Sequence, residues 1–219
     1  MNRQILAAIF KIFIAIIAWF ALVLQLFILI NNTPGNGMTP LQAIGRFFIF
    51  FTILSNLLVA VSLAIILIKS SSSPGRFFSK PFSVSAIAVY IFIVGLVYNI
   101  ILRPLWRPTG LQWVADELLH VAVPVLFLIY WVFLVFKGSL KWKHAFWWLI
   151  FPLFYLFYAM IRGKIEGFYP YPFIDLNKLG YSRVLLNCAG LTATFLIIGL
   201  LFVVADKIMG RYKTNRSKY

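Results

Sequence analysis

The chain is poor in the residue types from which metal, disulfide and haem sites are built. A single cysteine, Cys188, among 219 residues excludes an internal disulfide and a metal site made of several cysteines. The only histidines are His120 and His144, which are too few for a zinc site with three protein ligands. His144 lies in a basic loop, far along the chain from His120, which argues against a haem held by both. We therefore expect no metal and no cofactor.

Charge is also scarce, and most of it is positive. Charged residues make up 11% of the chain, with 20 Lys and Arg against 5 Asp and Glu, for a net charge of +15. No basic run alternates with aromatic residues, so nucleic-acid binding is not indicated. The chain is 63% hydrophobic, well above the roughly 45–50% of soluble domains, and its mean hydropathy is +0.95. These values predict an integral membrane protein with membrane lipids as its partners.

Six apolar stretches are long enough to cross a bilayer as helices, which takes about 20 residues. They are residues 5–30, 40–68, 82–102, 111–136, 145–161 and 183–204. The sequence therefore predicts an all-α, polytopic protein: a bundle of six transmembrane helices in one domain over residues 1–208, followed by a basic tail over 209–219. Most of the 20 basic residues fall on the side that carries both termini, and this excess predicts cytoplasmic termini.

His120 lies near the middle of the 111–136 stretch, where ionisable side chains are costly and rare. Asp116 is one helical turn earlier and Glu117 follows it, so a carboxylate could hold one ring nitrogen and leave the other as a base. Pro124 has no N–H to offer the carbonyl of His120, which predicts a kink there. His120 is therefore the first candidate for function, and a purely structural histidine is the alternative.

Thr52 is expected at a depth similar to that of His120. The segments Thr39-Pro-Leu-Gln42 and Thr109-Gly-Leu-Gln112 both predict a capping box at the start of a helix. At ~1.5 Å per residue, Thr52 and His120 lie roughly 20 and 16 Å along these two helices. The hydroxyl and the imidazole can meet if the helices face each other. Alternatively, Thr52 bonds only the main chain of its own helix, as threonines in membrane helices often do.

Further polar residues are expected in the outer half of the bundle, where they could line a wet cavity. Asn56 shares a helix face with Thr52. The others are Gln25, Tyr98, Asn99 and Asn187. The ordinary role of such residues is hydrogen bonding between membrane helices, and that alternative stays open.

Three short segments resemble one known family. They are Phe50-Phe-Thr-Ile-Leu-Ser-Asn56, Glu117-Leu-Leu-His-Val-Ala-Val-Pro124 and Gly167-Phe-Tyr-Pro-Tyr-Pro-Phe173. In this order they resemble the androgen-induced protein family, which includes the androgen-dependent TFPI-regulating protein and bacterial relatives. The resemblance covers nearly the whole chain. It implies six spans with both termini inside, and for a bacterial relative a place in the inner (plasma) membrane.

The resemblance also implies an activity. The animal members are described as intramembrane threonine hydrolases of fatty acid esters of hydroxy fatty acids, so it implies a lipid ester substrate. Carried over, Thr52 matches the nucleophile and His120 the base. This chain differs from the animal pattern one turn before the histidine, where it has Asp116-Glu117 in place of an Asn-His pair. Asp116, Glu117 and Asn56 are candidate supporting residues, with Asn56 as a donor to the developing oxyanion.

On the same interpretation, four residues are candidate substrate contacts. A substrate carboxylate could pair with Arg103 or Arg107, whose ordinary role is charge in an outer loop. Tyr171 and Phe173 could form part of a lid, or equally an interfacial anchor. Two other functions stay open: a proton-coupled transporter, which would also use a buried histidine with a carboxylate, and a non-enzymatic membrane scaffold.

Overall fold

The structure is a computed structural model that describes the backbone of residues 3–216, and side chains within residues 5–211 except 34 and 36. Every regular element in this part of the chain is helical, and residues 3–216 contain no strand. The all-α prediction is therefore confirmed. The tail predicted over 209–219 is helical as far as Arg216, and its last residues lie outside those described.

Six helical segments are long and apolar enough to cross a membrane, and each overlaps one predicted span. They are Ile5–Asn31, Phe51–Ile68, Pro81–Leu105, Gly110–Leu134, Trp142–Glu166 and Leu176–Arg211. Because six is an even number, a chain that crosses at all six would have both ends on one side of the membrane. The described residues divide into two compact units, the first ending at Val135 and the second beginning at Phe136.

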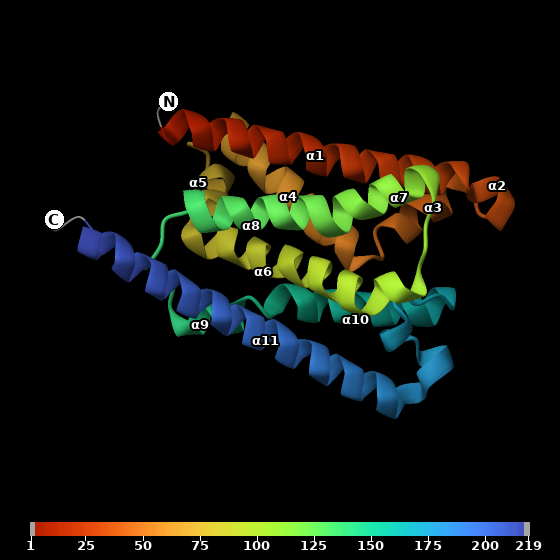
Figure 1. The fold of residues 1–219 in the computed structure, drawn as a ribbon. Coiled ribbons are helices and arrows are strands. Elements are labelled where there is room, and N and C mark those ends of the chain that lie inside the picture. Colours follow the sequence, from red (N-terminus) through yellow and green to blue (C-terminus); the bar gives the residue numbers. More distant parts are fainter. Residues whose placement is uncertain (1–2, 217–219) are drawn as a thin grey trace. The chain divides into compact units, whose positions relative to one another are not determined.

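The first unit is a helical bundle built around four long segments (Figure 1). Helix α1 packs along α4 and also along α7 and α8, while α6 packs between α4 and α8. The helices of this unit are α1 (Arg3–Asn31), α2 (Thr33–Asn36), α3 (Pro40–Phe47), α4 (Phe51–Ile68), α5 (Ser73–Ser79), α6 (Pro81–Val97), η1 (Tyr98–Leu102), η2 (Arg103–Leu105), α7 (Gly110–Glu117), η3 (Leu118–Ala122) and α8 (Val123–Leu134).

The second unit contains α9 (Trp142–Trp147), α10 (Ile150–Glu166), η4 (Pro172–Ile174) and α11 (Leu176–Arg216). Helix α11 packs on α9 and α10. Its backbone leaves the helical conformation at Gly180, where φ is 70° and an L side chain would be strained. The buried carboxylate of Asp206 accepts the N–H of Leu140 at 2.9 Å and so holds the segment before α9 against α11.

The second predicted span is not one continuous helix. Helix α3 ends at Phe47, residues 48–50 form a turn, and α4 begins at Phe51 with an extended Phe50 as its N-cap. Thr52 is therefore the second residue of a helix rather than the middle of one. The break falls in a run of aromatic and β-branched residues, which have low helix propensity.

The two predicted capping boxes have different outcomes. The box at Thr39 is confirmed: its hydroxyl accepts the N–H of Gln42, and the Gln42 side chain accepts the N–H of Thr39. The box at Thr109 is wrong. Helix α7 does begin at Gly110, but Thr109 makes no capping bond with its side chain. Gln112 instead bonds Gln25 and Asp116, because longer-range partners compete for its amide.

Two π-helical turns lie next to each other in the first unit. In η1, Arg103 donates its N–H to the carbonyl of Tyr98, and in η3 Val123 donates to that of Leu118, each five residues back. Turns of this kind are rare and frequently occur at functional sites. The turn η3 ends two residues before Pro124. The backbone therefore departs from α-helical geometry next to the proline, where the sequence predicted a kink because proline has no N–H.

A glycine allows α6 to approach η3 closely. A Cβ built on Gly95 would lie 3.1 Å from the carbonyl oxygen of His120 and 3.3 Å from the Cβ of Pro124. Both distances are tighter than ordinary van der Waals contact. Because η1 continues directly from α6, this approach brings the two π turns side by side.

We expect Gly95→Val to destabilise the first unit by roughly 1–3 kcal/mol, because overpacked side chains force helices apart. The measurement is the melting temperature of the purified protein in detergent. Gly190→Ala is the control, since a Cβ at Gly190 meets nothing within 4 Å and alanine favours a helix. Equal melting temperatures for the two variants would contradict the close packing at Gly95.

Candidate active site

The structure brings Thr52 and His120 together, although 68 positions separate them in the chain. Thr52 lies in the first turn of α4 and His120 is the central residue of η3. Both side chains are buried, and Thr52 Oγ1 lies 3.3 Å from His120 Nε2. The sequence predicted that the two side chains lie at a similar depth but left open whether their helices face each other. In the structure the two helices do face each other.

The other ring nitrogen of His120 determines the tautomer. Nδ1 lies 2.9 Å from the backbone carbonyl oxygen of Asp116, which can only accept a hydrogen bond. Nδ1 must therefore carry a proton, and in the neutral ring Nε2 is the unprotonated nitrogen that faces the Thr52 hydroxyl. This is the arrangement that a general base requires.

The carboxylate of Asp116 does not bond the ring, contrary to one expectation from the sequence. Asp116 is buried, and its side chain accepts hydrogen bonds from Tyr98 Oη (3.0 Å), Trp106 Nε1 (2.7 Å) and Gln112 Nε2 (3.1 Å). The negative charge is thus held one turn from His120 by three neutral donors. There it can stabilise a positive charge that forms on the imidazole.

Tyr98 forms one wall of the site. Its ring stacks on the His120 imidazole with centroids 3.7 Å apart and an angle of 13° between the planes. The guanidinium of Arg103 lies over the Tyr98 ring and also pairs with Glu117 at 2.7 Å. Glu117 therefore bonds Arg103 rather than His120, and the ring is fixed from one face by Tyr98.

Asn56 supplies a hydrogen bond that the main chain of η3 cannot make, and Asn99 donates to the carbonyl of the next residue. Because Val123 donates to Leu118, the next donor for the Leu119 carbonyl would be Pro124, which has none. Asn56 Nδ2 donates to that carbonyl at 3.1 Å and to the Thr52 carbonyl at 2.9 Å. Asn99 Nδ2 donates to the His120 carbonyl at 3.4 Å and to the Gly95 carbonyl at 2.8 Å.

These bonds alter what Asn56 can contribute. Both of its N–H groups are donated to carbonyls of two different helices. Donation to an oxyanion would require one of those bonds to break. The side chain instead ties the first turn of α4, which carries Thr52, to the π turn that carries His120. The catalytic interpretation of Asn56 stays a prediction, and its positioning role is visible in the contacts.

The remaining candidate residues have other surroundings. Arg107 is exposed in the segment before α7. Tyr171 and Phe173 belong to the second unit, where their rings stack on each other with centroids 5.2 Å apart. Asn187, also in that unit, donates to the Phe173 carbonyl at 2.8 Å. Substrate contacts by these residues stay predictions.

Two contacts at the site were not expected from the sequence. The indole N–H of Trp106 donates to the Asp116 carboxylate. Tyr98 was expected only to line a polar cavity, yet it stacks on the histidine. No local motif encodes either contact, because each joins residues that the chain reversal between η1 and α7 brings together.

We compared the chain with protein-family models, with curated proteins and with solved structures, and found no significant match.

Replacement of Asn56 by leucine is expected to lower the free energy of unfolding by roughly 1–3 kcal/mol. The variant keeps the size of the side chain but leaves a buried carbonyl without a donor. Asn99→Leu is the matched comparison and should cost less, since Asn99 is exposed and its bond to His120 is long. Thermal unfolding in detergent measures both. A larger loss for Asn99→Leu would argue against this account of η3.

Proposed function

We propose that the protein is an intramembrane hydrolase that cleaves a lipid ester with Thr52 as nucleophile and His120 as general base. The observation that carries this proposal is the pairing of the Thr52 hydroxyl with the unprotonated nitrogen of a buried imidazole. A threonine hydroxyl is a weak nucleophile until a base takes its proton. The resemblance to the androgen-induced protein family points to the same two residues.

In the first half of the reaction, Thr52 Oγ1 attacks the carbonyl carbon of the ester while His120 Nε2 takes the hydroxyl proton. The tetrahedral intermediate collapses as the bond to the alcohol oxygen breaks, and the alcohol leaves with the proton from Nε2. The acyl group is then bound to Thr52 as an ester. The nearby Asp116 carboxylate stabilises the imidazolium that exists between these two proton transfers.

In the second half, water attacks the acyl-threonine. His120 takes a proton from this water and returns it to Thr52 Oγ1 as the carboxylic acid product leaves. The position of Thr52 in the first turn of α4 supports the step, because the positive end of a helix dipole stabilises negative charge that develops nearby. The apolar lengths of the surrounding helices suit the chains of a lipid ester.

Substrate specificity is part of the proposal. Arg103 is half-buried, pairs with Glu117, and lies over the Tyr98 ring that stacks on His120, so it could orient a substrate carboxylate. A fatty acid ester of a hydroxy fatty acid carries such a carboxylate. We propose this substrate class, and a bacterial inner membrane as the location, on the resemblance.

A fluorophosphonate probe is expected to label Thr52, with displacement of fluoride by Oγ1. Labelling should be lost in Thr52→Ala and fall at least about a hundredfold in His120→Gln, which removes the base. Mass spectrometry of peptides from the labelled protein locates the adduct. Ser55→Ala, a buried hydroxyl on the same helix, is the control and should label normally.

Persistent labelling in Thr52→Ala, or an adduct at Ser55, would refute the assignment of the nucleophile. Proton-coupled flux in proteoliposomes that requires His120 but yields no adduct would favour a transporter. If neither adduct nor flux is observed, the result favours a membrane scaffold. Each outcome therefore selects one of the three functions considered.

Two variants at Tyr98 separate stacking from hydrogen bonding. Tyr98→Phe keeps the ring on His120 and loses only the bond to Asp116, so we expect less than a tenfold fall in kcat. Tyr98→Leu also removes the stacked wall, so we expect a fall of a hundredfold or more, with KM little changed. Steady-state hydrolysis of a fluorogenic lipid ester measures both. Equal kcat values for the two variants would show that the stack does not position the base.

A further inference from the structure

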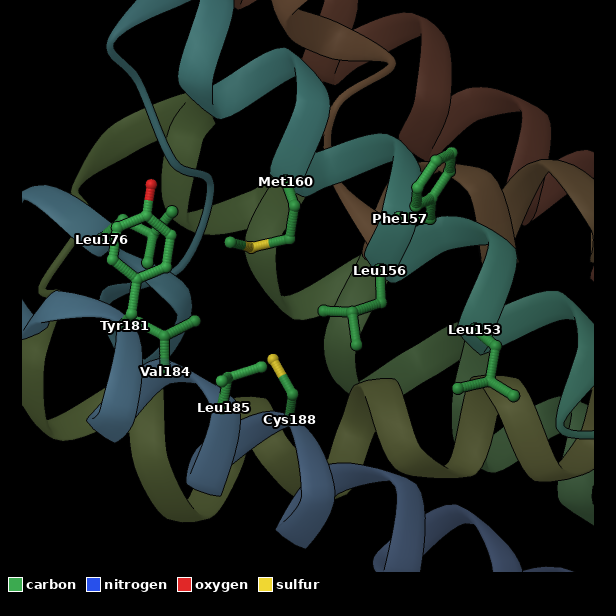
Figure 2. Close-up of a pocket in the computed structure, with 9 residues that line it drawn as sticks. All are labelled: Leu153, Leu156, Phe157, Met160, Leu176, Tyr181, Val184, Leu185 and Cys188. Carbon is green, nitrogen blue, oxygen red and sulfur yellow. The ribbon is translucent and has the colours of Figure 1, made fainter.

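The second unit contains an apolar groove that the proposed reaction does not use. It lies between α10 and α11, and its volume is about 250 Å³. Figure 2 shows Leu156 of α10 projecting toward Leu185 and Cys188 of α11, and Met160 extending toward Leu176 and Tyr181. The lining residues are Leu153, Leu156, Phe157, Met160, Leu176, Tyr181, Val184, Leu185 and Cys188. The only polar groups among these side chains are a phenol and a thiol.

A lysine follows the groove-lining residues of α10 on the same face of the helix. Its residues Leu153, Leu156, Phe157 and Met160 are spaced three and four apart and so lie on one helical face. The next position on that face, four residues after Met160, is Lys164, near the end of α10. Lys164 is exposed and, within the described residues, forms no ion pair.

Of the other cations near this end of the unit, Arg183 is exposed on α11 and two are already paired. Arg162 bonds Glu166 and Tyr158, and Lys178 lies 3.8 Å from Asp175. Among the residues that the structure describes, Lys164 is thus an unpaired cation that continues the α10 face of the groove. A flexible lysine side chain can extend toward the interface and bind a phosphate there while its methylene groups cover apolar surface.

We propose that the groove between α10 and α11 binds one acyl chain of an anionic phospholipid, with the lipid phosphate at Lys164. The groove lies between two helices, each of which is long and apolar enough to span the bilayer. Its lining side chains are apolar apart from a phenol and a thiol. Lys164 lies near the end of α10, where a helix that crosses the bilayer reaches the interface. This site is independent of the Thr52–His120 reaction.

A transmembrane helix is a poorer occupant than a lipid chain. Helices associate in membranes through small residues that let their backbones approach, such as glycine, alanine and serine. The groove is lined instead by leucine, phenylalanine, methionine and tyrosine. Its volume also lies just below the ~300–1,000 Å³ of sites that hold whole drug-sized ligands, which suits a single chain.

Native mass spectrometry of the purified, delipidated full chain tests the proposal. The probes are phosphatidylglycerol and phosphatidylcholine with the same oleoyl chains. We expect about fivefold tighter binding of the anionic lipid to the wild-type protein. Lys164→Gln should abolish that preference. Lys178→Gln, a control that removes a cation already paired with Asp175, should retain it.

A second pair of variants tests the groove itself. Leu185 and Leu186 are adjacent and equally exposed, at 67% and 66%, but only Leu185 lines the groove. Leu185→Trp should block the groove and weaken binding of both lipids about tenfold, whereas Leu186→Trp should leave binding unchanged. Circular dichroism and gel filtration verify that both variants fold.

Three results would overturn the proposal. The first is equal binding of the two lipids by the wild-type protein. The second is an equal effect of the two tryptophan variants. The third is a dimer that Leu185→Trp dissociates without any change in lipid binding, which would assign the groove to a second copy of this chain. The Thr52 labelling experiment is unaffected by any of them.

Discussion

The hydrogen bonding of backbone carbonyls inside the hydrocarbon layer is the constraint on which the site depends. In lipid, every main-chain polar group needs a partner within the protein. Pro124 withdraws an N–H in the middle of a span, and the π turn η3 shifts the register so that the Leu119 carbonyl also lacks a donor. The Asn56 amide donates to the Leu119 carbonyl and the Asn99 amide to the His120 carbonyl, each from a neighbouring helix. A local defect in one helix is thus satisfied by contacts between three helices.

The same contacts place the two candidate catalytic side chains, Thr52 and His120. Asn56 bonds both the Thr52 carbonyl and the Leu119 carbonyl, so one side chain sets the spacing between the first turn of α4 and η3. Gly95 lets α6 approach His120, and Tyr98, in the next turn, stacks on the ring. The same contacts therefore supply hydrogen-bond donors to backbone carbonyls and fix the positions of the two side chains. This explains why an irregular turn coincides with the candidate base.

Two carboxylates lie close to His120 in the chain, and they have different partners. Asp116 is buried, and its side chain accepts hydrogen bonds from three neutral donors rather than an ion pair. Glu117 is more exposed and pairs with Arg103, so its charge is neutralised. The single net negative charge near the imidazole is that of Asp116. A base that becomes positive during its reaction is favoured by such a neighbour.

The sequence by itself determined the six spans, the capping box at Thr39 and the irregular backbone before Pro124, because hydropathy, capping and proline chemistry act within a few residues of the chain. It also pointed to Thr52 and His120 as a pair at one depth. Only the tertiary structure decided that their helices face each other, that α4 begins at Phe51, and that the Asp116 main chain rather than its carboxylate bonds the ring. The physical reason is that these features follow from packing between helices distant in sequence, where alternative partners compete for the same polar groups.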